Sequence, residues 1–279
     1  MGSGMATRLI TAGHAVSVYN RSPERAAPFA RLGAKVAGSP RAAAERADII
    51  IGMSASDDSS RAIWLGDYGA LAADNLPDAL VIECSTLSHD WVLELARHVR
   101  ERGFRYVDAP VTGLPDAAAA GTLTLLVGAE PADLDAARPV FSSLATRVMH
   151  FGGVGQGTAY KLMVNLMGAV QIASAAEGIA LAERAGLDLK LVADAIASGQ
   201  AASPQVVRNV RRFVAEDHAG AVTFTPALRL KDIDYALRLA RKLGMECPFG
   251  TVAHDLYRKL CERGAGAHNE SRIIEVLRA

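Results

Sequence analysis

The first half of the chain alternates short apolar runs with amphipathic stretches, and no other feature constrains the fold as strongly. The apolar runs predict strands at residues 16–19, 49–51, 80–82, 106–107, 123–127 and 147–151. The stretches between them predict helices at residues 6–12, 23–32, 40–47, 60–64, 89–102 and 131–144. Alternation of this kind is typical of a parallel sheet covered on both faces, so we expect an α/β domain.

The pattern changes near residue 152. Residues 155–186 contain no proline and are rich in alanine, leucine, methionine and isoleucine, which predicts one helix of about 30 residues. Its many small side chains would let other helices pack closely against it. The rest of the chain predicts helices at residues 189–198, 204–216, 225–243, 248–263 and 271–277. We therefore expect two domains, an α/β domain over residues 1–152 and an all-helical domain over residues 153–279.

Composition excludes several classes of protein. Lysine plus arginine and aspartate plus glutamate both total 30, so the basic excess of a nucleic-acid-binding protein is absent. Cys84, Cys247 and Cys261 are widely spaced without metal-ligand spacing, which favours a reducing, cytoplasmic environment and no metal. The most apolar run, residues 162–176, is shorter than the roughly 20 residues of a membrane span, and no signal peptide is apparent.

The loop after the first predicted strand carries Asn20, Arg21 and Ser22. In a dinucleotide-binding fold this strand ends beside the adenosine ribose, where an acidic residue would bind the ribose hydroxyls. An arginine between two polar residues suits a 2′-phosphate instead, because it can form charge-assisted hydrogen bonds. These residues favour NADP over NAD. The alternative is that Arg21 is simply a solvated side chain.

The opening residues resemble those of a known family. Met1-Gly2 followed by Met5-Ala6, Gly13-His14 and Tyr19-Asn20-Arg21-Ser22 resembles the β-hydroxyacid dehydrogenases, which include 3-hydroxyisobutyrate dehydrogenases and tartronate semialdehyde reductases. The resemblance extends over essentially the whole chain. It implies a Rossmann-type, doubly wound sheet, and an all-α domain joined to it by a long helix. In that family a strand and the first part of the glycine-rich loop precede the Met-Gly, so we expect about ten residues to be absent, with Gly2 as the third glycine of the loop.

A second motif, Asp108-Ala-Pro-Val-Thr-Gly113, follows the strand predicted at residues 106–107. The corresponding family motif ends in Ser-Gly-Gly and holds the substrate carboxylate. The resemblance therefore assigns substrate binding to Thr112 and Gly113, with Leu114 in place of the second family glycine. The alternative is a turn in which proline fixes the backbone, and the other motifs of the chain favour the substrate-binding interpretation.

The most specific motif is Gly153-Val-Gly155-Gln-Gly157 followed by Lys161 and Asn165. The last two lie four residues apart on the predicted long helix, so their side chains share one face. A positioned ammonium can donate a proton to a carbonyl oxygen that gains negative charge, an effect typically worth ~10²–10⁴-fold in rate. The resemblance makes Lys161 the catalytic residue and Asn165 a substrate-binding residue, although Val164 stands where many members carry a second asparagine. A solvated lysine is the alternative, but an apolar stretch disfavours an unused charge.

The resemblance adds further cofactor-binding residues: Gly2, Met53, Ser54, Thr86 and Lys231. Lys231-Asp232 could also be a solvated ion pair. Together these features predict an oxidoreductase that transfers a hydride between NADP, or alternatively NAD, and a small β-hydroxy acid or semialdehyde. Two alternatives are an imine reductase on the same scaffold, whose known members usually lack the lysine, and a binding or scaffold protein without cofactor. The small-residue-rich helix predicts a homodimer or higher homo-oligomer.

Overall fold

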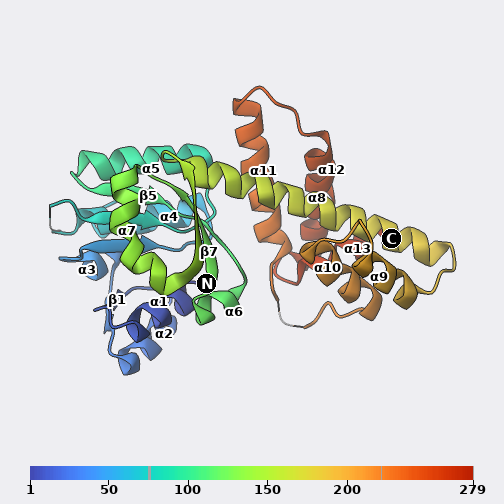
Figure 1. The fold of residues 1–279 in the computed structure, drawn as a ribbon, viewed down its shortest axis with the longest axis horizontal. Coiled ribbons are helices and arrows are strands. Elements are labelled where there is room, and N and C mark those ends of the chain that lie inside the picture. Colours follow the sequence, from blue (N-terminus) through green and yellow to red (C-terminus); the bar gives the residue numbers. More distant parts are fainter. Residues whose placement is uncertain (75–76, 221, 279) are drawn as a thin grey trace. The chain divides into compact units, whose positions relative to one another are not determined.

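The computed structural model describes residues 1–74, 77–220 and 222–278. The chain divides into two compact units, Met1–Lys161 and Leu162–Ala279, which we call unit 1 and unit 2. Helix α8 (Gln156–Arg184) begins in unit 1 and continues through unit 2 (Figure 1). Unit 1 contains the strands, and the regular elements described in unit 2 are all helical.

The main sheet of unit 1 has the strand order β3-β4-β5-β7-β6, with β8 paired to β7. These strands span β3 (Ile49–Gly52), β4 (Leu80–Glu83), β5 (Arg105–Asp108), β6 (Val111–Thr112), β7 (Leu123–Gly128) and β8 (Ala145–Gly152). Strands β3, β4 and β5 are parallel, and β8 is parallel to β7. Strand β7 runs antiparallel to both β5 and β6, so the sheet is parallel-dominated rather than wholly parallel. Only Ala109 and Pro110 separate β5 from β6, and both of these strands pair with β7.

A second, two-stranded sheet pairs β1 (Ser17–Val18) with β2 (Lys35–Val36) in parallel. Strand β2 was not predicted, since two exposed residues carry no apolar periodicity. The helix expected over residues 23–32 is divided into α2 (Pro23–Ala26) and a 3₁₀ helix, η1 (Ala27–Leu32). Pro28 explains the division, because proline has no N–H to donate to the preceding turn.

Helices cover both faces of the main sheet (Figure 1). Alternate residues of β4 enter two different cores, as expected from the two-residue period of a strand. Leu80 and Ile82 pack with residues of α1 (Gly2–Thr11), α6 (Pro115–Ala120) and α7 (Pro131–Leu144). Val81 packs with residues of α3 (Pro40–Ala44), α4 (Asp57–Trp64), the 3₁₀ helix η2 (Ala70–Ala72) and α5 (His89–Glu101). The doubly wound α/β architecture predicted from the sequence is confirmed.

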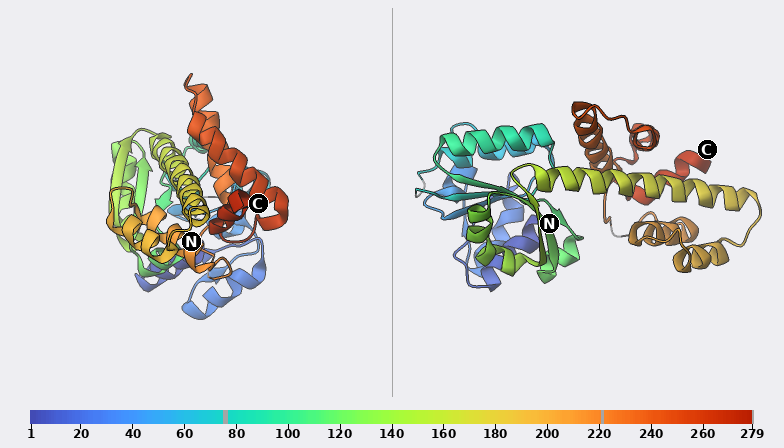
Figure 2. Two further views of the ribbon diagram at one scale, coloured as in Figure 1. Left: turned by 90° about the vertical axis from the view of Figure 1, so that its right-hand side faces the viewer. Right: turned by 45° about the horizontal axis from the view of Figure 1, so that its top comes forward.

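Unit 2 is a helical domain gathered along α8 (Figure 2). Its other elements are α9 (Leu189–Ser198), α10 (Pro204–Ala215), α11 (Pro226–Lys242), α12 (Pro248–Leu260), a π-helical turn (Cys261–Ala265), a 3₁₀ helix (Glu270–Ile273) and α13 (Ile274–Arg278). Side chains of Asp188, Ser203 and Thr225 cap the starts of α9, α10 and α11 by accepting backbone N–H groups. Such caps satisfy donors that a helix cannot satisfy internally.

Helix α8 is long and apolar enough to cross a bilayer by length and composition alone. This property is weak evidence for a membrane span, because core helices of globular domains share it. In this structure Ala169, Ile172, Ala176 and Ile179 of α8 are completely buried in the core of unit 2. The helix therefore has a structural role in that core.

Candidate functional site

The loops that follow β3 and β4 meet at the carboxyl ends of these strands. The backbone N–H of Ser54 donates to Oγ of Ser85 at 2.6 Å, and the Ser85 hydroxyl donates to Oγ of Ser54 at 3.2 Å. Met53 precedes the first of these serines and Thr86 follows the second. In doubly wound sheets, ligands bind outside the carboxyl ends of the strands. The structure thus brings together three of the residues predicted to bind cofactor: Met53, Ser54 and Thr86.

A buried carboxylate shapes these loops. Oε1 of Glu83 accepts the backbone N–H of Ser85 at 3.0 Å, and Oε2 accepts from the Ser60 hydroxyl at 2.8 Å and from Nε1 of Trp64 at 2.7 Å. At Gly52, a Cβ would lie 2.7 Å from the Trp64 ring, so only glycine fits. Glu83 was not predicted to have a role, although one carboxylate that ends an apolar strand is a visible signal.

Gly2 lies in the first turn of α1, beside Met53. A Cβ on Gly2 would lie 3.6 Å from Cγ of Met53, an ordinary van der Waals contact. The close approach of α1 to its neighbour occurs instead at Gly4, where a Cβ would lie 2.7 Å from the backbone nitrogen of Ala119 in α6. The first turn of α1 therefore places its unsatisfied N–H groups, which suit a phosphate, beside the loop after β3.

Asn20, Arg21 and Ser22 follow β1 in the separate two-stranded sheet. Oδ1 of Asn20 accepts the backbone N–H of Ser22 at 2.9 Å, which leaves the amide Nδ2 to donate elsewhere. The guanidinium-bearing Arg21 is exposed, and Ser22 is half-buried. A guanidinium, an amide N–H₂ and a hydroxyl form a donor set that fits a phosphate.

Thr112 and Gly113 lie where β6 ends. Thr112 pairs with Thr124 of β7, and both Thr112 and Gly113 are exposed. Gly113 has a φ of +132°, and a Cβ there would lie 2.9 Å from Cδ2 of Leu123. Glycine is therefore required by the backbone, and the Thr112 hydroxyl remains accessible to a ligand.

Asp108 connects this segment with the start of α8. Oδ1 accepts the backbone N–H of Gly155 at 2.6 Å, and Oδ2 accepts that of Thr158 at 2.8 Å. The side chain is completely buried, and burial raises its pKa to about 6, although the two N–H groups oppose this rise. Lys161, half-buried, follows Thr158 by one turn of the same helix.

Asn165 and Lys231 both interact with Asp232 in unit 2. Nδ2 of Asn165 donates to Oδ2 of Asp232 at 2.6 Å, and Nζ of Lys231 lies 3.0 Å from Oδ1 of Asp232. Asp232 and Asn165 are buried. Because Nδ2 is bound to the carboxylate, the amide orientation of Asn165 is fixed and its Oδ1 is turned away as an acceptor. The sequence had assigned the motif to Lys231 alone, and the role of Asp232 was missed.

A buried ion pair supports the same part of α8. Arg229 of α11 pairs with Glu270 at 2.8 Å and donates from Nη1 to the backbone oxygen of Asn165 at 3.3 Å. Both charged side chains are buried, so each compensates the charge of the other. No sequence motif had indicated this pair.

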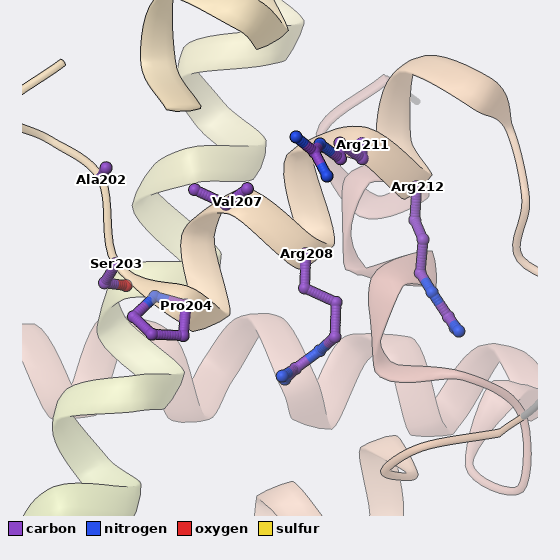
Figure 3. Close-up of a pocket in the computed structure, with 7 residues that line it drawn as sticks. All are labelled: Ala202, Ser203, Pro204, Val207, Arg208, Arg211 and Arg212. Carbon is purple, nitrogen blue, oxygen red and sulfur yellow. The ribbon is translucent and has the colours of Figure 1, made fainter. Parts of the chain in front are cut away.

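A pocket of about 660 Å³ lies at the start of α10 (Figure 3). It is lined by Ala202, Ser203, Pro204, Val207, Arg208, Arg211 and Arg212. None of the residues predicted to bind cofactor or substrate is among them. Across residues 1–74, 77–220 and 222–278, no three histidine, cysteine, aspartate or glutamate side chains are grouped as metal ligands.

Comparison with known proteins places both units in one family. Residues 1–153 match the NAD-binding domain of 6-phosphogluconate dehydrogenase, and residues 155–277 match the NAD-binding domain of NADP-dependent 3-hydroxyisobutyrate dehydrogenase. The NAD-dependent L-serine dehydrogenase of Pseudomonas aeruginosa is 33% identical over 95% of this chain and 90% of its own length.

Two solved structures are similar over nearly the whole chain. The 3-hydroxyisobutyrate dehydrogenase of Mycobacterium tuberculosis with L-serine has a TM-score of 0.89 and 31% identity, covering 100% of this chain and 96% of its own. Psf3, in complex with NADP⁺ and 2-OPP, has a TM-score of 0.88 and 25% identity, covering 99% of this chain and 96% of its own. The family-model matches, the relative's identity and the shared fold lead to one conclusion: the chain belongs to the β-hydroxyacid dehydrogenase family of NAD(P)-dependent oxidoreductases.

Proposed function

We propose that the protein is an NADP-dependent dehydrogenase of a small β-hydroxy acid, or a reductase of the matching semialdehyde, with Lys161 as general acid and base. The observation that carries the proposal is the placement of Lys161 and Asn165 one turn apart on α8. The start of this helix is bound to Asp108, which begins the segment containing Thr112 and Gly113.

The proton is moved by Lys161. In the oxidation direction, the neutral amine of Lys161 accepts the proton of the substrate hydroxyl, and in the reduction direction its ammonium returns a proton to the carbonyl oxygen. When bound, the nicotinamide supplies or accepts the hydride at the carbon that carries this oxygen. Asn165 orients the same oxygen-bearing group without competing as a base. Thr112 and the backbone at Gly113 bind the substrate carboxylate.

Residues of unit 1 suit the cofactor. Met53, Ser54 and Thr86 at the carboxyl ends of β3 and β4 would hold the nicotinamide half, and Gly2 at the start of α1 would bind phosphate. Lys231, whose Nζ lies 3.0 Å from Oδ1 of Asp232, is the remaining residue that we propose binds cofactor.

Cofactor choice depends on the loop after β1. Asn20, Arg21 and Ser22 form the donor set that favours a 2′-phosphate and hence NADP. The structural neighbour with NADP⁺ supports this assignment. NAD is the alternative, because the P. aeruginosa relative is NAD-dependent.

We also propose a homodimer or higher homo-oligomer in the cytoplasm. Several large apolar side chains of unit 2 are exposed, including Met163 (47%) and Met167 (52%) on α8 and Phe249 (75%) on α12. Apolar surface of this kind favours self-association. All three cysteines are free thiols, in agreement with a reducing compartment. A strict monomer in analytical ultracentrifugation would contradict the oligomer.

The function is tested with a panel of substrates and both cofactors. Short β-hydroxy acids, semialdehydes and a cyclic imine are assayed with NADPH or NADP⁺ and with NADH or NAD⁺, following the absorbance of the reduced nicotinamide. We expect turnover of at least one hydroxy acid and its semialdehyde, with higher kcat/KM for the NADP couple. Turnover of the imine alone would indicate an imine reductase. Absence of cofactor binding in calorimetry, with no turnover, would indicate a binding protein.

A further inference from the structure

The first turn of α8 is capped by a side chain from a distant part of the chain. The N–H groups of Gly155 and Thr158 are among those that a helix cannot satisfy internally. In a local capping box, a side chain at the N-cap accepts one of these bonds and a side chain three residues later accepts the other. In this structure the two oxygens of Asp108, at the end of β5, accept both, at 2.6 and 2.8 Å.

No side chain at the N-cap could replace this carboxylate. Gly155 has a φ of +91°, and a Cβ there would lie 2.9 Å from Nε2 of His89 and 3.1 Å from Cδ2 of Leu93. The cap must therefore come from another element. When ionised, Asp108 also places a negative charge at the positive end of a 29-residue helix, which is favourable.

Backbone contacts hold the same turn against the sheet. A Cβ on Gly157 would lie 2.7 Å from the backbone nitrogen of Gly128 in β7, and a Cβ on Gly128 would lie 2.8 Å from the backbone nitrogen of Gly157. A Cβ on Gly128 would also collide with Oδ1 of Asp108. Helix, strand and carboxylate therefore meet without intervening side chains, so the start of α8 rests directly on Asp108 and β7.

Two predicted functional groups take their positions from this junction. Lys161 lies one turn beyond Thr158, and Thr112 and Gly113 lie four and five residues beyond Asp108. We propose that Asp108 is a positioning residue that holds the Nζ atom of Lys161 in register with the substrate-binding segment. This inference rests on the proposed role of Lys161.

The burial of Asp108 supports this role. A carboxylate in a fully buried position costs free energy to ionise, and burial raises its pKa to about 6. Packing alone would be served as well by a neutral side chain. A carboxylate at this position instead provides acceptors for the N–H groups of Gly155 and Thr158 at the start of α8, the helix that carries Lys161.

The test is the substitution Asp108→Asn. The introduced amide would retain one acceptor and turn an N–H₂ toward the other backbone donor, so the helix start shifts without loss of volume. Because displacements of about 1 Å at a reacting group can cost ~10²-fold in rate, we expect kcat to fall ~10- to 100-fold with KM changed less than about threefold. The matched control is Asp188→Asn, which alters the carboxylate cap of α9 and should leave kcat unchanged.

A double-variant comparison separates positioning from simple loss of stability. If Asp108 acts through Lys161, Asp108→Asn should lower kcat in the wild-type background but change it less than about threefold in the Lys161→Ala background. The same fold-loss in both backgrounds would overturn the proposal, as would an unchanged kcat for Asp108→Asn alone. Lys161→Ala with near-full turnover would refute the proposed function itself, and the positioning role with it.

Should Asp108→Asn fail to fold, Asp108→Ser provides the same comparison. The smaller side chain leaves room for a water molecule to reach the N–H groups of Gly155 and Thr158. We expect Asp108→Ser to reduce kcat as Asp108→Asn does in the wild-type background, and to cause no such reduction in the Lys161→Ala background. A folded Asp108→Ser protein with wild-type kcat would overturn the proposal.

Discussion

The buried carboxyl group of Asp108 predicts an unusual dependence of stability on pH. Burial raises its pKa from an ordinary 3.8 to about 6. Because the folded-state pKa is the higher one, the folded protein binds this proton more tightly than the unfolded chain does, and protonation of Asp108 adds to the free energy of unfolding. This contribution is fully present below about pH 3.8 and is lost as pH rises through about 6. At about 1.4 kcal/mol for each pH unit between the two values, the full effect is about 3 kcal/mol.

The perturbation is Asp108→Asn, which removes the titration, and the measured quantity is the difference in free energy of unfolding between wild type and variant. Urea unfolding followed by tryptophan fluorescence reports on unit 1, because both tryptophans, Trp64 and Trp91, are buried there. Neighbouring ionisable groups such as Glu83 and His89 are present in both proteins, so their contributions cancel in the difference. We expect the wild-type protein to lose about 2–3 kcal/mol relative to the variant between about pH 4 and pH 7.

A difference that is constant across this range, or that grows with pH, would refute the reasoning. A difference that grows with pH would mean that the hydrogen bonds from the N–H groups of Gly155 and Thr158 have a larger effect than burial and hold the pKa of Asp108 below its ordinary value. The sign of the change therefore decides which of the two opposing effects is larger.

Three further variants test other parts of the site. Arg21→Ala should raise KM for NADPH by ~10- to 150-fold, because a charged hydrogen bond of about 1.5–3 kcal/mol is lost, and should leave KM for NADH nearly unchanged. The control is Arg25→Ala, which removes a neighbouring exposed arginine, and equal effects of Arg21→Ala on both cofactors would contradict the NADP assignment. Asp232→Asn would place a second amide against the amide of Asn165, so it should raise KM for the hydroxy acid and lower the stability of unit 2 by ~1–3 kcal/mol in thermal unfolding. An unchanged KM would argue against a role of Asp232 in orienting Asn165. Gly157→Ala should lower the free energy of unfolding by ~1–3 kcal/mol or more through overpacking against the backbone of β7. Gly178→Ala on the same helix meets no atom within 4 Å and should be neutral or stabilising, so equal unfolding curves for the two variants would exclude the backbone contact.

Helices with apolar periodicity, or with a long proline-free apolar composition, could be predicted from sequence. Helix α7 spans residues 131–144 and α9 residues 189–198, as expected, and α8 begins and ends within two residues of its predicted bounds. Proline at the first position and a polar residue before it mark the starts of α7 and α10. Apolar periodicity was sufficient for α7 and α9, which each bury one side in a core, whereas α8 was predicted from its long proline-free, apolar composition.

Short strands could not be predicted. Strand β6 consists of Val111 and Thr112, which exist as a strand only because β7 pairs with them. The sequence indicated a turn in this place, with proline before it. The antiparallel direction of β7 likewise depends on pairing between segments that local propensity does not determine.

The candidate site also combines residues that local sequence patterns indicate with residues that only long-range contacts bring in. The sequence indicated Lys161, Asn165 and Lys231 by motif and spacing, but no local pattern could indicate that Asp108 binds a turn 47 residues further along the chain. The bond between Asn165 and Asp232 spans 67 residues. Such contacts arise from the fold, so the supporting residues of the site became visible only in the structure.

The central claim is that Lys161 transfers the proton, and steady-state kinetics of Lys161→Ala tests it most directly. With the best hydroxy acid and saturating cofactor, we expect kcat to fall ~10²–10⁴-fold with cofactor affinity retained. The exposed Lys190 of α9 provides the control, and Lys190→Ala should keep wild-type kcat. Near-full turnover by folded Lys161→Ala would contradict the assignment of Lys161 as general acid and base.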